Sequence, residues 1–364
     1  MFNLGETCMK KSLIALAVLA AAGAASAQSS VTIFGIVDAT LQFGRGTVSD
    51  MTRLGSGGLS TSRIGFRGTE DLGGGMSASF WLEAQFFADT GLGDSTNSNN
   101  QTTGTSNATA GTQGLTFNRR STVSLAGRWG EVRLGRDYIP PYENTIRFDP
   151  FSVIGVGGTL LHQIGSSDAV GGPVAQRSSN GVTYFLPRNL GGFYGSVQYH
   201  MGENSQNGAA TENDGRGMGI RLGYAGGPVD VAIGTHRADY AAGDTRRTNL
   251  AGQWDFGVAR AMFQIERARN GTLDGKGWMV GSRIPVGAGE IRAAYSVYET
   301  DLAGTPESKK LAIGYTHNLS KRTAVYTTYA RLKNNAAARV ALNGSSTGLG
   351  SSSSGLDIGL RHSF

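Results

Sequence analysis

Apolar and polar side chains alternate with a period of two residues along most of this chain, and this pattern constrains its fold more than any other feature. The alternation is clear in segments 31–43, 62–69, 118–126, 218–224 and 290–298. Because successive side chains of a β-strand point to opposite faces, each segment predicts a strand with one apolar and one polar face. A helix, whose apolar residues recur every three or four positions, does not fit this pattern.

Short and long connections alternate between the predicted strands. Tight turns are predicted at 71–75, 127–130, 187–192, 226–228, 255–257, 285–289 and 318–321. Longer polar segments are predicted at 45–61, 88–117, 139–176, 201–215 and 334–354, with shorter ones near 241, 270 and 302. About sixteen strands follow, with both ends of the chain on the short-turn side. Short periplasmic turns and long extracellular loops are typical of outer-membrane barrels.

Composition agrees with a barrel. The chain has 56 Gly and only 8 Pro among 364 residues, which suits strands and turns better than helices. Mean hydropathy is −0.20, and no stretch approaches the 18 apolar residues of a transmembrane helix. We therefore predict an all-β fold, a sixteen-stranded antiparallel transmembrane β-barrel, which is wide enough to hold an aqueous channel.

The first 27 residues have the pattern of a cleaved signal peptide. Lys10 and Lys11 precede the apolar segment 13–25, and an A-x-A site predicts cleavage between Ala27 and Gln28. About 13 apolar residues are too few to span a bilayer as a helix. Met9 directly precedes the lysines, so our hypothesis for residues 1–8 is an upstream start-codon artefact.

Cleavage would leave residues 28–364 as a single barrel domain. This portion has 364 − 27 = 337 residues and a net charge of +6 − 1 = +5, since Glu6 and two lysines are removed. It also lacks Cys8, the one cysteine of the sequence, so we expect no disulfide. Backbone hydrogen bonds and packing must then hold the fold together.

No catalytic, metal or cofactor site is predicted. The five histidines have neither metal-ligand spacing nor a paired nucleophile. The run from Leu54 to Ser60 lacks the lysine of a phosphate-binding loop, so we interpret it as a hairpin loop. Basic residues are dispersed along strands rather than gathered in one patch, which argues against nucleic acid as a partner.

The chain ends on an alternating strand. Leu356, Ile358, Leu360 and Phe364 alternate with polar residues and glycine, and the aromatic residue is the last of the chain. We predict that Phe364 completes the strand that closes the barrel.

The segment LGRDYIPPYENTIRFDPF, residues 134–151, interrupts the succession of hairpins. Pro140, Pro141 and Pro150 prevent a strand from continuing, and a polar, glycine-rich segment follows to about Arg177. Pro141 is suited to begin a short helix that extends to Phe148. Our hypothesis is that this segment folds inward and narrows the lumen.

Several segments together identify a family. They are SSVTIFGIVDA, SRIGFRGTEDLGGGMSASFWLEAQF, FNRRSTVSLAGRWGEVRLGRDY with the following FDPF, SSNGVTYFLP, NLSKRTAVYTTYA and the terminal GLRHSF. In these segments the chain resembles the Gram-negative general diffusion porins, in particular the betaproteobacterial-type branch. The resemblance implies a sixteen-stranded barrel in the cell outer membrane, a homotrimer, and a third extracellular loop folded inward as a constriction.

Two polar loops match none of these motifs. They are residues 94–114 and residues 345–354, rich in Ser, Thr, Asn and Gly. For the first loop, the resemblance implies a latch onto a neighbouring subunit; the alternative is a solvated loop without a fixed conformation.

Strand parity supplies candidate charges for a constriction. The predicted basic wall consists of Arg63, Arg67, Arg120 and Arg133. The predicted constriction loop contributes Asp137, Glu143 and Asp149, with Arg147 able to serve either side. Opposed charges across a narrow pore select among ions. The alternative is that the arginines pair with structural acids such as Glu83.

These observations predict a channel and not an enzyme. We expect passive diffusion of small hydrophilic solutes and ions through a water-filled pore, with a mild preference for anions because the chain is basic. The alternative is a substrate-specific channel with a saturable site in the constriction loop. Surface cations are candidates for binding anionic lipopolysaccharide and outer-membrane lipid, and the pairs at 246–247 and 309–310 are either such rim residues or solvated strand ends.

Overall fold

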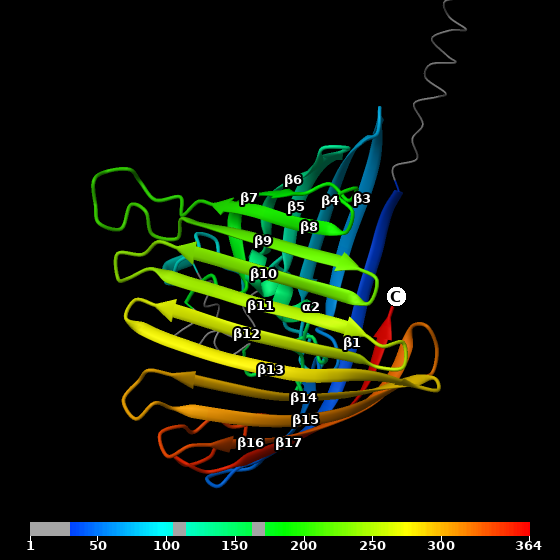
Figure 1. Ribbon diagram of the computed structural model, residues 1–364, viewed down its shortest axis with the longest axis vertical. Helices are drawn as coiled ribbons and strands as arrows, with labels where there is room; N and C mark the ends of the chain where they lie inside the picture. The colour runs from blue at the N-terminus through cyan, green and yellow to red at the C-terminus, as the bar shows by residue number, and fades with distance from the viewer. Residues whose placement is uncertain (1–29, 105–113, 162–171) are drawn as a thin grey trace, which may run out of the picture.

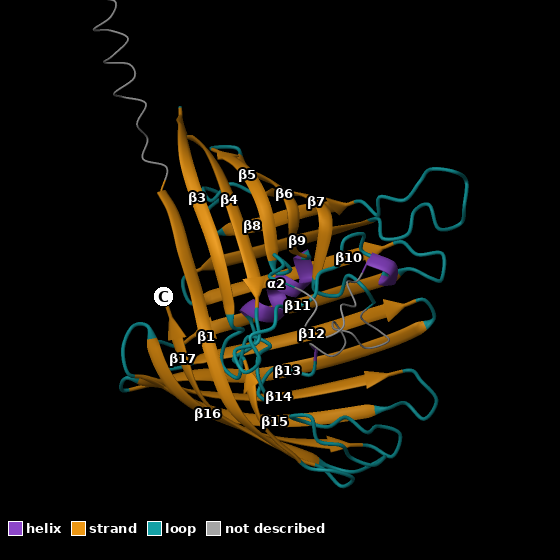
Figure 2. Cartoon of the chain, turned by 180° about the vertical axis from the view of Figure 1, so that it is seen from behind, coloured by secondary structure: helices purple, strands orange, loops and turns teal. Residues whose placement is uncertain are grey.

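The computed structural model describes residues 30–104, 114–161 and 172–364, which form one closed antiparallel sheet (Figures 1 and 2). The predicted signal peptide lies outside the described residues. The strands are β1 (Ser30–Arg45), β2 (Met51–Ser56), β3 (Arg63–Gly73), β4 (Met76–Gln85), β5 (Arg120–Gly127), β6 (Gly130–Tyr138), β7 (Arg177–Phe185), β8 (Phe193–His200), β9 (Gly217–Gly226), β10 (Val229–Ala238), β11 (Thr245–Asp255), β12 (Arg260–Asn270), β13 (Leu273–Val286), β14 (Gly289–Thr300), β15 (Glu307–Asn318), β16 (Thr323–Asn334) and β17 (Ser353–Ser363). The described helices are α2 (Pro140–Arg147) and a 3-10 turn, η1 (Thr102–Gly104).

The 17 strand segments occupy sixteen positions around the barrel, because β2 and β3 share one position. β2 pairs with residues 39–44 of β1, whereas β3 pairs with residues 30–36 of the same strand. The prediction of a sixteen-stranded antiparallel barrel is therefore confirmed.

The interruption between β2 and β3 corrects two details of the sequence interpretation. The long connection predicted at 45–61 is wrong, since the loop proper covers only residues 46–50 and β2 follows it. The run from Leu54 to Ser60 is not a hairpin loop: it ends β2 and then leaves the sheet. There the backbone N–H groups of Leu59 and Ser60 donate to the carboxylate of Asp38, at 3.0 and 2.6 Å.

β17 closes the barrel by pairing with β16 on one side and β1 on the other. Beyond the strand, the backbone of Phe364 exchanges two hydrogen bonds of 3.1 Å with that of Gly35. The ring of Phe364 lies against Gly35, where a side-chain Cβ would overlap it. Glycine at position 35 thus permits the last aromatic residue to pack at the seam.

The two faces of the sheet have opposite polarity, and the apolar face is the outer one. On β12, Phe263 and Ile265 are exposed, whereas Gln264 and Glu266 point inward and are buried. A water-soluble protein would reverse this arrangement. Apolar residues outside and polar residues inside are the distribution that a transmembrane barrel requires.

Short turns and long loops separate to the two rims, as the sequence predicts. All seven predicted tight turns join consecutive strands. The connection near 270, predicted as one of the shorter segments of the long-loop rim, consists only of residues 271–272 between β12 and β13. Gly271 has a φ of +60°, a conformation that glycine adopts without strain, which explains why two residues suffice.

The second long loop contacts its own barrel in its described part. Asn100 is fully buried, and its amide nitrogen donates to the carbonyl oxygens of Ser179 and Met201, at 3.0 and 2.9 Å. The alternative of a solvated loop without fixed conformation is therefore wrong for residues 97–104. Residues 105–113 of the proposed latch lie outside the described residues.

The main apolar core lies inside the barrel, where the third long loop (139–176) packs on the wall. Phe151, Leu160 and Leu161 of this loop are buried against Met279 of β13 and Leu332 of β16. The loop therefore fills part of the lumen (Figure 2). No helix among the described residues is long and apolar enough to cross a membrane.

Candidate functional site

The helix of the third loop begins where the sequence prevents β6 from continuing. Ile139 is extended, with φ −75° and ψ 148°, because the residue before a proline disfavours the helical conformation. Pro140 and Pro141 then occupy the first helical turn, where their missing N–H groups cost no hydrogen bond. The predicted helix is confirmed, and it covers Pro140–Arg147.

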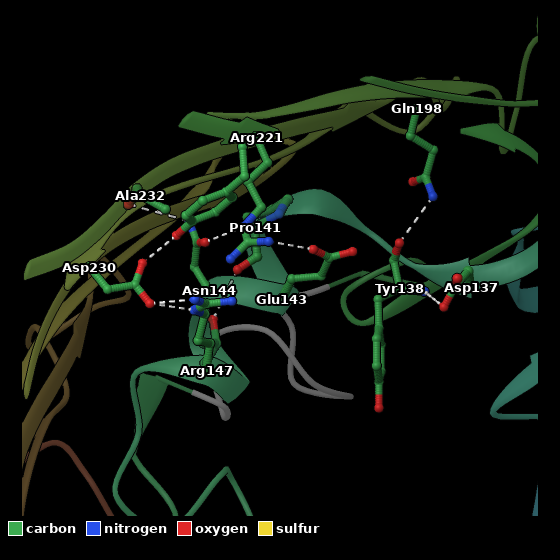
Figure 3. A network of polar contacts seen from close by, with 12 residues as sticks. Asp137, Tyr138, Pro141, Glu143, Asn144, Arg147, Gln198, Arg221, Asp230 and Ala232 are labelled. Atoms are coloured by element: carbon green, nitrogen blue, oxygen red, sulfur yellow. Dashed lines mark hydrogen bonds and ion pairs between the residues drawn. The ribbon is translucent and has the colours of Figure 1, made fainter. Parts of the chain in front are cut away.

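One side of α2 docks on the inner wall formed by β9, β10 and β11. Asn144 is fully buried, and its amide nitrogen donates to Asn249 Oδ1 at 3.0 Å and to Ala232 O at 3.4 Å. Its own Oδ1 accepts a hydrogen bond of 2.6 Å from Arg221 Nε. Figure 3 shows Asn144 of the helix beside Arg221 and Ala232 of the wall.

Two glycines make this close approach possible. A Cβ added at Gly219 of β9 would lie 2.9 Å from Pro140, and one added at Gly234 of β10 would lie 2.8 Å from Pro141. Both distances are shorter than van der Waals contact. Any larger residue at these positions would push α2 away from the wall and toward the centre of the barrel.

The charges of α2 pair with this same wall. Glu143 accepts a hydrogen bond from Arg221 at 2.7 Å, and Arg147 forms an ion pair with Asp230 at 2.5 Å (Figure 3). Burial raises the pKa of the Glu143 carboxyl above its ordinary value, while the charge of Arg221 opposes that shift. The ion-pair partner of Glu143 is therefore Arg221 on β9; of the predicted basic residues, Arg133 acts on Glu143 through space without forming an ion pair.

Asp149 organises the loop from within and does not reach the passage. Its carboxylate is fully buried and accepts hydrogen bonds from the backbone N–H groups of Phe151, Val153 and Thr159, at 3.0, 2.8 and 2.9 Å. Burial raises its pKa, and the three N–H groups oppose that shift. Arg283 of β13 secures the same turn by donating to Pro150 O at 2.8 Å.

The candidate for the open passage lies on the other side of the loop. It is a cavity of about 570 Å³ between Tyr142, Ile146 and residues 152–154 of the loop and the wall that faces them. Among the described residues that line it, the one acid is Asp94, and the arginines are Arg63, Arg119, Arg177, Arg283, Arg292 and Arg361. Fixed charges of one sign in a narrow passage concentrate counter-ions there.

Of the four predicted wall arginines, Arg63 lines this cavity. Its Nε lies 3.8 Å from Glu83 Oε1, and Glu83 also accepts a 2.5 Å hydrogen bond from Arg119. Arg67 lies further along β3, and its guanidinium stacks on the ring of Trp81, 5.1 Å from the centroid. The structure thus places these two arginines on one wall, but only Arg63 at the cavity.

Arg120 and Arg133 surround Asp137, the predicted acid at the root of the loop. Arg133 Nη1 lies 2.6 Å and Arg120 Nε lies 3.5 Å from Asp137 Oδ2, and Arg133 also pairs with Glu131 at 2.9 Å. Arg120 and Arg133 thus fit the alternative given in the sequence analysis, in which the predicted wall arginines pair with structural acids. Neither arginine lines the cavity.

Sequence reasoning missed five of the six arginines at the cavity. The signal was present for Arg292 and Arg361, which alternate with the apolar residues Ile291 and Leu360. Arg119 precedes β5 and neighbours Arg120, so strand parity does not decide its direction. Strand parity does not predict which arginines lie close together, because β3, β13, β14 and β17 meet at one cavity only in the closed barrel.

Comparisons with known proteins agree with this geometry. Residues 13–337 match the family described as Gram-negative porin. The chain is 38% identical to outer membrane porin protein 32 of Delftia acidovorans, with 98% of this chain and 100% of the relative covered. Identity to an outer membrane porin of Bordetella pertussis is 27%, with coverage of 98% and 100%. The solved structure of an anion-selective porin from Comamonas acidovorans is 34% identical, with a TM-score of 0.80 and coverage of 93% and 100%.

Proposed function

Because this chain belongs to the Gram-negative porins, we propose that it is a water-filled outer-membrane channel for passive diffusion of small hydrophilic solutes and ions, with a preference for anions. The observation that carries the anion preference is the cavity lining, in which six arginines accompany a single acid among the described residues. An anion is attracted to this cavity, whereas a cation is repelled.

We propose a channel and not an enzyme. Among the described residues, no group of three or more His, Cys, Asp or Glu side chains could hold a metal ion. The family supports a homotrimer, and residues 1–27 have the pattern of a signal peptide that directs export. These assignments of oligomer and export are part of the proposal.

Planar-bilayer recording tests pore, oligomer and selectivity together. We expect conductance to appear in three equal steps and the reversal potential in a salt gradient to indicate anion preference. The double variant Arg63→Gln/Arg361→Gln should move the reversal potential toward the non-selective value. Arg67→Gln is the matched control, since Arg67 shares the wall but does not line the cavity. A cation-selective wild type, or an unchanged reversal potential in the double variant, would contradict the proposal.

A substrate-specific channel remains the second candidate, and one observation favours it. The buried Nε atoms of Arg177 and Arg361 have no hydrogen-bond partner among the described residues, and both side chains line the passage. Such donors could hold an anion long enough to saturate the channel. Block of the current by low concentrations of one anionic solute would support this candidate, whereas conductance that stays linear with solute concentration would support general diffusion.

A further inference from the structure

Asparagine directly precedes glycine at four places in the chain, residues 180–181, 207–208, 270–271 and 343–344. In such a pair the backbone nitrogen of the glycine can attack the side-chain amide of the asparagine, because no Cβ on the glycine shields the approach. The sequence does not distinguish the four pairs. Their surroundings in the folded barrel differ, and they single out Asn207 and Gly208.

Asn207 lies in the loop between β8 and β9, which projects beyond the long-loop rim (Figure 1). Asn204 closes the neck of this loop, because its amide nitrogen donates to the carbonyl oxygens of Glu212 and Asp214, at 3.4 and 2.6 Å. Asn207 and Gly208 are exposed. The closed neck therefore holds residues 207–209 beside Glu212 while leaving them open to water.

Two hydrogen bonds prepare Asn207 for such an attack. The N–H of Gly208 donates to Glu212 Oε2 at 2.9 Å, which places a carboxylate base on the attacking nitrogen. The N–H of Ala209 donates to Asn207 Oδ1 at 3.0 Å, which holds the side chain over the Gly208 peptide and stabilises negative charge on that oxygen. Gly208 has a φ of +77°, a conformation that favours glycine. Base, nucleophile and electrophile thus lie within one turn of the loop.

The other three pairs lack this combination among the described residues. The N–H of Gly271 donates at 3.0 Å to the backbone carbonyl oxygen of Asp244, which is a far weaker base than a carboxylate. Gly181 lies within β7, which pairs with β6 on one side and β8 on the other. At the fourth pair, the amide nitrogen of Asn343 donates to Asp357 Oδ1 at 2.8 Å, which holds the leaving group in place.

We propose that Asn207 is a site of self-catalysed deamidation, with Glu212 as the general base. The Gly208 nitrogen gives its proton to the Glu212 carboxylate and forms a bond to Cγ of Asn207, while the Ala209 N–H stabilises the developing oxyanion. The Cγ–Nδ2 bond then breaks, and Nδ2 leaves as ammonia with the proton that Glu212 returns. The product is a five-membered succinimide ring. Water opens this ring at either carbonyl, which yields aspartate or isoaspartate.

The reaction occurs once in each chain and adds one negative charge to the loop. The new carboxylate at position 207 lies beside Glu212, so the two groups repel each other. Isoaspartate also lengthens the main chain by one methylene group, which disturbs the hydrogen bonds of the turn. The long-loop rim of an ageing barrel thus becomes more acidic. This modification does not depend on the proposed channel, since a barrel without anion preference would undergo the same reaction.

Peptide mass mapping of the full barrel, kept folded in mild detergent at neutral pH, tests the site. We expect the amide at position 207 to convert to the acid faster than those at 180, 270 and 343, and faster than in the urea-unfolded chain. Glu212→Gln should slow the conversion at least about tenfold, because a positioned base contributes roughly a hundredfold or more and hydroxide in water still acts. Glu203→Gln is the matched control, since Glu203 is an exposed acid of the same loop.

Methylation by an isoaspartate-specific methyltransferase detects the isoaspartate product, which forms only through the ring. The proposal is overturned if Asn207 converts no faster in the folded barrel than in the unfolded chain, if Glu212→Gln converts as fast as the wild type, or if Glu203→Gln slows the conversion equally. Aspartate without isoaspartate would also overturn it, since water would then have attacked the amide directly. The compact band in semi-native electrophoresis verifies that both variants fold.

Discussion

At the scale of single residues, the acids beside the arginines decide how much positive charge the passage presents. Glu83 contacts both Arg63 and Arg119, whereas no ion pair of Arg361 is observed among the described residues. Arg133 lies between Glu131 and Asp137, which neutralise it. Counting arginines by strand parity therefore overstates the contribution of some and misses others, because parity does not show which acid lies alongside.

The variant Glu83→Gln should increase the preference for anions. It removes a negative charge 2.5 Å from Arg119 and 3.8 Å from Arg63, both of which line the cavity. The reversal potential in a salt gradient should move further from zero in the anion-selective direction. Glu307→Gln is the control, because Glu307 lies on the outer face. A decrease in anion preference for Glu83→Gln would show that Glu83 acts mainly by positioning these arginines.

At the scale of elements, two contacts hold the third loop. We expect disturbing one of them to raise the conductance and disturbing the other to lower it. The turn around Asp149 folds the loop on itself, and α2 is drawn onto β9–β11 by Asn144 and its neighbours. The first contact keeps the loop compact, and the second keeps it clear of the opposite wall. The width of the passage depends on both.

We expect Asp149→Ala to loosen the loop and raise single-channel conductance or its noise. Three buried N–H groups lose their acceptor, and each buried donor left without a partner costs about 1–3 kcal/mol. Single-channel recording measures the effect. Asp89→Ala, which alters an exposed acid of the second long loop, should leave the conductance unchanged. An Asp149→Ala channel as quiet and narrow as the wild type would show that the packing of the loop, and not Asp149, fixes its shape.

Gly234→Leu should have the contrary effect and reduce conductance. Its side chain would occupy the space of Pro141 and displace α2 toward the passage. Gly114→Ala is the control, because a Cβ added there meets no atom within 4 Å. If Gly234→Leu conducts like the wild type, the helix has room to move sideways along the wall.

At the scale of the whole molecule, closure determines both stability and site. β1 is bonded to β17 along one edge and to β2 and β3 along the other, so no strand is left with an unpaired edge. The same closure brings Arg361 of β17 and Arg63 of β3 to one cavity, although almost 300 residues separate them in sequence. Damage at the seam is therefore expected to affect the entire barrel.

Gly35→Val should impair assembly at this seam. A side chain at position 35 would overlap the ring of Phe364, while the backbone hydrogen bonds between the two residues hold them together. We expect a lower temperature for the shift from the compact to the unfolded band in semi-native electrophoresis. In the double variant Gly35→Val/Phe364→Ala the overlap with the ring is relieved, while the close approach of a Cβ to Arg63 O at 2.7 Å remains, so that temperature should recover in part. No recovery would mean that the backbone of β1, rather than the ring, suffers from the change.

The sequence by itself determined the strands, the polarity of their faces, the tight turns and the helix at Pro140 and Pro141. These features follow from local rules of alternation and backbone conformation, which neighbouring residues satisfy without reference to distant ones. It also placed Arg63 correctly on the inner face. The sequence did not reveal that β2 and β3 share one position, since the pattern of a short strand followed by glycines also suits a hairpin loop.

Only the tertiary structure decided which charges meet. Glu143 pairs with Arg221, and the Asp149 carboxylate accepts hydrogen bonds from backbone N–H groups of its own loop. The arginines that line the passage come from both ends of the chain. The energy of a charge depends on distance and burial, and both are set by barrel closure and by the side of the lumen on which the loop packs. The alternation of apolar and polar residues predicts which face of the sheet a side chain occupies. Only the closed sheet determines which residues lie across the lumen from it.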